Sequence, residues 1–284
     1  MPELPEVEVT CQGLRPHLLG RTILTIRSSG KPLRQPIPED LLRCCLCANT
    51  ILAVERRAKY VLIRLKDGAV LVIHLGMTGK LGIFSVDAEP ARHDHLVLTL
   101  ENEMELRFND ARRFGCVVVW PADKVEEQEQ VFLARQGIEP FSEDFCGMSL
   151  QQLAQQCNLP IKGFLMDSRR ISGIGNIYAN EILFAAGIHP LCPAKTLSRE
   201  QWQEIVVCTV RILKQAIAAG GSTISDFLGA SGQPGYFQLQ LAVYGKMGED
   251  CPRCGEEIAK EVIGGRATFF CLQCQKVPRI ISPR

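Results

Sequence analysis

The first nine residues, MPELPEVEV, place a proline second and glutamates at positions 3 and 6. Removal of Met1 would leave Pro2 with a free secondary amine. An α-amine titrates near ~8, so a fraction of it is uncharged at neutral pH and could form an iminium with an electrophilic carbon. Glu3 and Glu6 would lie beside this amine on one side of a helix. The alternative interpretation is that Pro2 is only a common second residue and that the two glutamates cap a helix.

A second group of chemically active residues lies near the C-terminus. CPRC at 251–254 and CLQC at 271–274 give the pattern Cys-x2-Cys-x16-Cys-x2-Cys, a spacing typical of a structural zinc ribbon. Four thiolates complete a tetrahedral shell and leave no position for catalysis. Two redox pairs or a disulfide knot are the alternatives. Between the pairs, GGRATFF places Arg266 at the tip of an expected β-hairpin, where a guanidinium suits a phosphate or is simply solvated.

Three further segments combine cations with apolar tips. They are RRAKY (56–60), HLGMTGKL (74–81) and NDARRFG (109–115). An arginine pair beside an exposed aromatic ring is what a wedge that displaces a base requires. Each segment has a plainer explanation, namely solvated arginines and apolar residues of a core. The glycine-rich SGIGN (172–176) opens a helix but lacks a nucleotide-binding pattern, so we expect no nucleotide cofactor.

The composition is that of an ordinary soluble protein, with 284 residues, 46% hydrophobic residues and a net charge of +1. A nucleic-acid partner must therefore be argued from local clusters. We expect no secretion signal and no membrane span. The odd total of thirteen cysteines, nine of them without a framework spacing, and the expected absence of a signal peptide indicate reduced thiols in a cytosolic protein. We interpret the nine outside the C-terminal pairs as small core residues; the alternative for Cys44, Cys45 and Cys47 is metal binding or oxidant sensing.

Hydrophobic periodicity predicts an α+β protein. Residues 5–18 have helical spacing, and Pro16 is expected to end or kink that helix. From about 22 to 120 the period is two, and KYVLIRL and AVLVIHL form an expected hairpin around 66–68, which predicts an antiparallel β-sandwich. After the charged stretch 123–130 the pattern becomes helical. Helices are expected at 176–187 and after a Ser198–Gln201 capping box, the latter ending at Gly220-Gly221.

Together these motifs resemble those of the bacterial formamidopyrimidine-DNA glycosylases, which repair oxidised purines. The resemblance covers nearly the whole chain, and its most specific parts are the N-terminal motif, GIGNIY and the zinc ribbon. The matching segments are PELPEVE at 2–8, RRAKY at 56–60, HLGMTG at 74–79, HDH at 93–95, DARRFG at 110–115, GIGNIYANE at 173–181, GIHP at 187–190, PGYF at 234–237 and GRATFFC with CLQCQK to 276.

The resemblance implies roles for individual residues. Pro2 would attack C1′ of the damaged nucleotide, Glu3 would act as acid and proton shuttle, and Glu6 would support the protonation state of the amine. Lys59 would donate a proton in β-elimination, and Arg266 would take part in δ-elimination, by positioning phosphate in our interpretation because its pKa exceeds ~12. Residues that would contact the DNA or fill the gap of the extruded base are Met77, His93, Arg112, Arg113, Phe114, Lys162 and Asn176. The 231–237 region would close over the lesion.

The resemblance also implies an architecture and partners. We expect an N-terminal catalytic β-sandwich with its leading helix (1–133), a helix–two-turn–helix DNA-binding domain (134–247) and a zinc ribbon (248–284). One structural Zn²⁺ would be bound by the cysteines, which are Cys251, Cys254, Cys271 and Cys274. Damaged double-stranded DNA would lie in the cleft between the domains of a monomer in the bacterial cytoplasm, associated with the nucleoid through DNA.

Three positions depart from the family pattern, and two other functions stay open. Ala111 replaces the usual proline, QQCNL (155–159) lacks lysines, and Arg169 and Arg170 follow nearby. A non-catalytic zinc-ribbon DNA-binding protein is one alternative. The other is the related subfamily that acts on oxidised pyrimidines, as endonuclease VIII does. A zinc ribbon of translation or transcription would leave the N-terminal motif unexplained.

Overall fold

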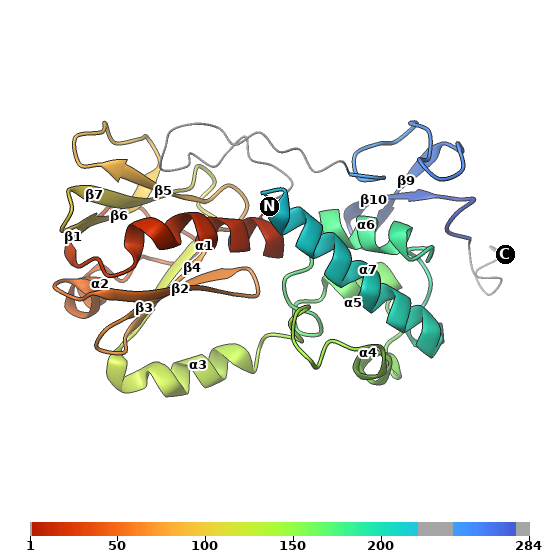
Figure 1. Cartoon of the computed structure of the whole chain (residues 1–284), viewed down its shortest axis with the longest axis horizontal. Helices are drawn as coiled ribbons and strands as arrows, with labels where there is room; N and C mark the ends of the chain where they lie inside the picture. Colours follow the sequence, from red (N-terminus) through yellow and green to blue (C-terminus); the bar gives the residue numbers. More distant parts are fainter. Residues whose placement is uncertain (1, 221–240, 277–284) are drawn as a thin grey trace. The chain divides into compact units, whose positions relative to one another are not determined.

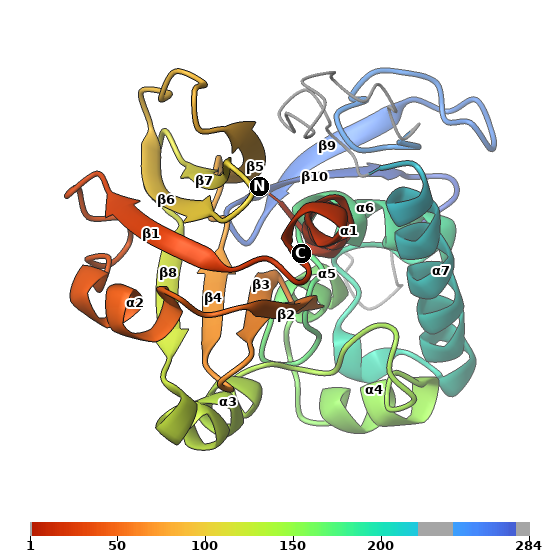
Figure 2. The same ribbon diagram turned by 60° about the vertical axis from the view of Figure 1, so that its left-hand side comes forward.

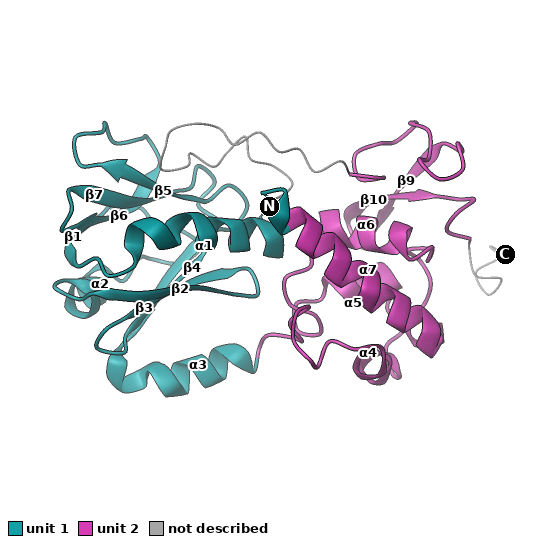
Figure 3. Cartoon of the chain, in the orientation of Figure 1, with its two compact units in different colours: residues 1–134, 217–238 teal, residues 135–216, 239–284 magenta. Residues whose placement is uncertain are grey.

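The computed structural model describes residues 2–220 and 241–276. The chain divides into two compact units (Figure 3), one made of Met1–Ala134 with Ile217–Gln238 and the other of Arg135–Ala216 with Leu239–Arg284. The expectations for PGYF (234–237) and for closure by the 231–237 region lie outside the described residues, as does Gly221.

The first unit contains an antiparallel β-sandwich, as the period-two pattern predicted. Its two sheets have the strand orders β1-β6-β7-β5 and β2-β3-β4-β8 (Figure 2). Their apolar faces enclose one core that includes Ile63, Leu98 and Phe108. The expected hairpin is β3–β4, which pairs Tyr60 with His74. The strands are β1 (Ile23–Ser28), β2 (Ile51–Arg57), β3 (Tyr60–Leu65), β4 (Val70–His74), β5 (Lys80–Ser85), β6 (Asp94–Leu100), β7 (Met104–Asn109) and β8 (Cys116–Trp120).

Helix α1 (Leu4–Leu18) packs along β2 (Figure 1). Its buried face comes from the helical spacing of Val7, Cys11, Leu14 and Leu18, so the predicted helix is confirmed. Pro16 lies inside the helix, which continues to Leu18. Proline lacks the N–H that would donate to the carbonyl four residues before it, and α1 ends two residues after Pro16.

Three elements of this unit were not expected from the sequence: α2 (Glu39–Leu46), the short 3₁₀ helix η1 (Ala122–Lys124) and α3 (Val125–Leu133). The charged stretch after residue 122 is thus helical itself. No residue of α3 is fully buried, which explains why its apolar periodicity is weak. The helix is held by an ion pair from Arg64 to Glu129 (2.6 Å) and by the ring of Phe132 against Tyr60 and Trp120.

The second unit is mainly helical, with a β-hairpin at its C-terminal end. The predicted capping box is present, because the backbone N–H of Ser198 donates to Gln201 and the N–H of Gln201 donates back to Ser198 Oγ. Trp202 then packs on Phe164 in the core of the helices. The elements are α4 (Gly147–Ala154), α5 (Ile161–Met166), α6 (Asn176–Ala185), η2 (Ala194–Thr196), α7 (Arg199–Ala218), β9 (Ile258–Ile263) and β10 (Arg266–Cys271). Within the described ranges, no helix combines the length and apolarity needed to cross a membrane.

The nine scattered cysteines are only partly core residues. Four are buried, namely Cys11, Cys157, Cys192 and Cys208. Burial raises the pKa of Cys11 to about 12 and that of Cys208 to about 11, so both thiols are protonated and unreactive at neutral pH. Cys44 is exposed, and the core interpretation is wrong for it. Cys44 lies on α2, shortly after Leu41 and Leu42. The sequence pattern did not predict this helix and so did not indicate which of its faces is buried.

Candidate functional site

The N-terminal glutamates form a capping box at the start of α1. The backbone N–H of Glu3 donates to the Glu6 carboxylate (2.9 Å), and the Glu3 side chain accepts from the backbone of Glu6 in return. Glu3 is only 1% exposed. The plainer interpretation of the glutamates, helix capping, is therefore correct for their local structure, and it holds a carboxylate in a defined place directly beside Pro2.

The RRAKY turn is attached to the same helix. Arg56 donates to Glu8 on α1 (3.2 Å) and to the carbonyl of Ala58 (3.0 Å). Ala58 adopts a left-handed conformation with φ of 54° and is buried. This tight β2–β3 turn fixes the backbone that precedes Lys59, whose side chain is half-buried. The Arg56 guanidinium thus connects the start of α1 with the Lys59 turn.

Two loops of the sandwich, 75–79 and 110–115, are packed backbone against backbone. A Cβ on Gly76 would lie 2.5 Å from the backbone of Phe114 and Gly115, so no larger residue fits. This contact joins the loop that contains Met77 to the loop that contains Arg112 and Phe114. Phe114 is 43% exposed, and the Arg112 guanidinium lies 4.7 Å above its ring. The stacked cation and exposed ring have the composition that a base-displacing wedge requires.

Asp110 forms hydrogen bonds with both loops. Its fully buried carboxylate accepts from the Thr78 hydroxyl (2.6 Å) and from the backbone N–H groups of Gly115 (2.8 Å) and Arg112 (3.3 Å). Its own N–H donates to the carbonyl of His93 (3.0 Å). Asp110 was not expected to have a role, although its place in the DARRFG motif, directly before a loop, is a typical position for an Asx-turn carboxylate.

Two histidines support these loops as neutral rings. Burial, together with the charges of Arg34 and Lys59, lowers the pKa of His74 to about 4, so its Nδ1 is free to accept from the Gly76 N–H (3.0 Å). Burial also lowers the pKa of His95, which bridges Ser29 and the carbonyl of Asp110. His93 is half-buried next to this histidine and was the only one of the three singled out from the sequence.

In the second unit, the predicted site residues gather around β10. Asn176, at the start of α6, donates to the carbonyl of Ala267 (3.0 Å), and Lys162 on α5 donates to the same carbonyl (2.9 Å). Lys162 is 1% exposed, so its ammonium points into the protein. Arg266 is exposed beside the two glycines of the hairpin tip, as expected.

Helix α6 anchors the rest of the C-terminal segment through two residues that the sequence analysis did not single out. Asn180 accepts from the N–H of Phe269 on β10 (2.7 Å). Glu181 accepts from three successive backbone N–H groups, at residues 242–244, at distances of 2.7 to 3.0 Å. The NIYANE motif is therefore an attachment surface. The sequence did contain a signal for this role, namely two adjacent polar residues in a largely apolar stretch of the helix, because buried polar side chains need hydrogen-bond partners.

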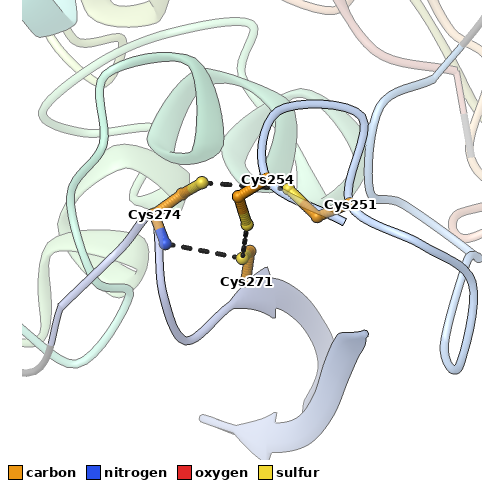
Figure 4. Close-up of side chains that lie close together, drawn as sticks. All are labelled: Cys251, Cys254, Cys271 and Cys274. Atoms are coloured by element: carbon orange, nitrogen blue, oxygen red, sulfur yellow. Dashed lines mark hydrogen bonds between the residues drawn. The ribbon is translucent and has the colours of Figure 1, made fainter. Parts of the chain in front are cut away.

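The four C-terminal cysteines form a metal-binding cluster (Figure 4). Their sulfur atoms all lie within 4.8 Å of one another, with Cys251 and Cys274 3.8 Å apart and Cys254 and Cys271 3.5 Å apart. Sulfurs bound tetrahedrally to Zn²⁺ at about 2.3 Å are separated by about 3.8 Å, so the cluster fits this ion. Burial and the neighbouring thiols raise the pKa of Cys274 to about 12, and a divalent cation would offset the cost of ionising it. The cysteines form a structural zinc site.

Family models match the chain in three successive segments. The N-terminal domain of formamidopyrimidine-DNA glycosylase matches residues 1–117, its H2TH domain matches residues 136–228, and a zinc finger found in FPG and IleRS matches residues 248–277. The chain belongs to the formamidopyrimidine-DNA glycosylase family. It is a DNA-repair glycosylase with a DNA-binding H2TH domain and a zinc finger, as the resemblance implied.

Relatives in this family match over their full length. The formamidopyrimidine-DNA glycosylase of Vibrio cholerae is 45% identical over 275 residues, which cover 97% of this chain and all of that protein. The protein of the same name from Stutzerimonas stutzeri is 44% identical over 276 residues, with the same coverage. Family membership therefore concerns the whole chain and not one shared domain.

Solved structures of the family have the same fold. A Lactococcus lactis FPG mutant bound to DNA containing Fapy-dG matches with a TM-score of 0.88 at 32% identity, covering 97% of this chain and 100% of that one. The Lactococcus lactis enzyme in complex with DNA containing an abasic site matches with a TM-score of 0.87 at 32% identity. These comparisons confirm the α+β architecture.

Asp110→Asn should loosen the two loops. The Asp110 carboxylate accepts all three hydrogen bonds, from the Thr78 hydroxyl and from two backbone N–H groups. The NH₂ group of an asparagine cannot accept, so one of these buried donors would lose its partner. Leaving it unsatisfied costs about 1–3 kcal/mol. We expect the free energy of unfolding in urea to fall by about this amount, while Asp87→Asn, at an exposed position, changes it by less than about 0.5 kcal/mol. Equal stability of the two variants would contradict the assigned role of Asp110.

Removal of zinc should unfold the C-terminal hairpin. Structural zinc contributes on the order of 10–16 kcal/mol of apparent binding free energy at neutral pH in small domains. The intact protein is expected to contain one zinc ion per chain by atomic emission, and Cys251→Ser to contain almost none. Cys44→Ser is the matched control and should retain zinc. A full zinc content in Cys251→Ser would show that the cluster binds the metal differently.

Proposed function

We propose that this chain is a bifunctional DNA glycosylase and abasic-site lyase that removes oxidised purines, such as 8-oxoguanine and formamidopyrimidines, from double-stranded DNA. Membership in the formamidopyrimidine-DNA glycosylase family over the full chain carries the proposal. The Lactococcus lactis relative bound to a Fapy-dG duplex supports the choice of substrate.

In the proposed reaction the Pro2 amine, exposed after removal of Met1, attacks C1′ of the damaged nucleotide. The C1′–N bond breaks, the base leaves with the bonding electrons and takes up a proton, and the opened sugar remains attached to Pro2 as an iminium. Glu3 supplies the proton that helps to open the sugar ring, and Glu6, whose carboxylate accepts from the Glu3 N–H, supports the protonation state of the amine. The buried position of Glu3 at the helix start supports this role, because a carboxyl group held in a defined place and protonated at that stage is an effective general acid.

The iminium then allows strand cleavage. Loss of a proton from C2′ expels the 3′-phosphate, and a second elimination expels the 5′-phosphate. We assign Lys59 to proton donation in the first step and Arg266 to positioning the phosphate in the second. The connection of the Lys59 turn to α1 through Arg56 and Glu8 supports the first assignment. The exposed, arginine-tipped hairpin supports the second.

A glycosylase must extrude its target nucleotide, because C1′ cannot be reached inside the base stack. We propose that the tips of the two packed loops fill the vacated space, with Met77 and Phe114 as apolar wedges and Arg112 opposite the remaining cytosine. Arg113, His93 and Asn176 would contact the DNA backbone. The stacked arrangement of Arg112 on Phe114 supports a wedge that is formed before DNA binds.

Each of three domains would have a separate function. We propose a catalytic domain at 1–133, a helix–two-turn–helix domain at 134–247 and the zinc ribbon at 248–284. The three family-model matches each fall within one of these ranges. A Lactococcus lactis FPG structure with an oxidized pyrimidine in its DNA shows that such a lesion can be bound by a relative, so oxidised pyrimidines are the competing substrate class.

Borohydride trapping tests the covalent step. Wild-type protein with a duplex carrying 8-oxoguanine opposite cytosine should give a reduced adduct that peptide mass mapping locates at residue 2. Pro2→Gly should lose most of the adduct. Glu3→Gln should lower the rate of base release by a factor of about 10² to 10⁴, the usual contribution of a general acid.

The exposed Glu101→Gln variant serves as the control and should react like the wild type. A duplex with an oxidised pyrimidine gives the second substrate arm, and faster release there would reverse the proposed specificity. A wild-type protein that lacks Met1, forms no adduct and releases no base from either duplex would instead be a non-catalytic DNA-binding protein.

Binding to lesion duplex should depend strongly on salt. A protein that neutralises 6–10 phosphates loses a factor of about 10³ to 10⁵ in affinity between 50 and 200 mM salt. Replacing one phosphate-binding cation, as in Arg113→Gln, should lower the slope of log K against log salt by about 1. Fluorescence anisotropy at four salt concentrations measures this slope. An affinity that does not change with salt would exclude the proposed backbone contacts.

A further inference from the structure

Lys162 on α5 contacts the backbone that carries Arg266. Its Nζ donates to the carbonyl of Ala267 (2.9 Å) and to the hydroxyl of Thr268 (2.7 Å). The Thr268 hydroxyl in turn donates to the carbonyl of Arg266 itself (3.1 Å). A chain of hydrogen bonds therefore leads from one ammonium group to the residue at the hairpin tip.

This contact is buried. Lys162 is 1% exposed and Thr268 is fully buried, whereas Arg266 is exposed. A charged group in such a position is retained only when its hydrogen bonds are satisfied, and bonds from an ammonium to a carbonyl are stronger than neutral ones. Asn176 adds a second donor to the Ala267 carbonyl (3.0 Å). The start of β10 is thus bound by side-chain donors from both α5 and α6.

We propose that Lys162 is a positioning residue that orients Arg266, and not a residue that binds DNA directly. It aligns the start of β10 so that the exposed guanidinium reaches the phosphate lost in the second elimination. The proposal rests on the proposed lyase function. It replaces the direct DNA contact that the family resemblance implied for Lys162, since the ammonium is turned inward to β10.

A double-mutant cycle separates the two roles. Lys162→Met removes the ammonium but keeps most of the side-chain volume, and Arg266→Gln removes the guanidinium. On a duplex with a preformed abasic site, each single variant should slow the second elimination by about tenfold. In the Arg266→Gln background, Lys162→Met should change this rate by less than about twofold, because a residue that acts through Arg266 has nothing left to orient. Multiplying effects would overturn the proposal.

The salt dependence of binding gives a second readout. A direct phosphate contact by Lys162 would contribute about 0.9 to the slope of log K against log salt in either background. A positioning residue should leave the slope of the Arg266→Gln protein unchanged. Lys195→Met, which removes an exposed lysine of the same unit, is the matched control for loss of charge and should leave the elimination rate unaltered.

A second variant covers the case in which Lys162→Met does not fold, as judged by zinc content and circular dichroism. Thr268→Val removes only the hydroxyl that connects Lys162 to the Arg266 carbonyl. It should slow the second elimination by about threefold in the wild-type background and have no effect in the Arg266→Gln background. An unchanged rate in the wild-type background would refute the hydrogen-bonded chain.

Failure of this inference can be distinguished from failure of the proposed function. If the wild-type protein forms the Pro2 adduct and cleaves twice, but the Lys162 and Arg266 effects multiply, only the positioning role is wrong. If the wild-type protein forms no adduct and cleaves nothing, the proposed lyase function is wrong, and with it the role of Arg266 on which the inference rests.

Discussion

Buried polar groups must find hydrogen-bond partners inside the protein, and in this chain they find them in the backbones of loops. Asp110 binds the two loops of the sandwich, and Glu181 binds three successive N–H groups of the segment 242–244. Lys162 and Asn176 both bind the carbonyl of Ala267. Removal of any one partner would leave an uncompensated group, so each loop conformation is linked to the stability of its unit.

In this arrangement the backbone of each loop is fixed by buried groups, while the side chains at its tip are exposed. Phe114, Arg112 and Arg266 are exposed, whereas the groups that hold their backbones are almost completely buried. A tip mounted in this way can reach a ligand without a large loss of backbone entropy on binding. The same logic applies to the zinc site, where four thiolates hold the loop and strand that flank the arginine-tipped hairpin.

The N-terminus shows that a capping role and a chemical role can fall on the same residues. The capping box accounts for the types of Glu3 and Glu6 without any reaction. It also produces what the proposed reaction needs, namely a buried carboxylate next to residue 2. Helix capping and the proposed reaction therefore call for the same two side chains, and a measurement of covalent chemistry separates the two explanations.

The elements with strong periodicity and the cysteine cluster could be predicted from local sequence patterns. The sandwich, α1, the Ser198 capping box and the zinc ribbon follow from side-chain period, capping residues and ligand spacing, which are local properties of the chain. Helices α2 and α3 were missed because their apolar faces are short or weak. The groups that hold the candidate site could not be predicted in this way, because they are brought together by the folded chain. Asp110 and Thr78, and Lys162 and Thr268, are paired across 32 and 106 residues, and no local pattern encodes a hydrogen bond between positions so far apart.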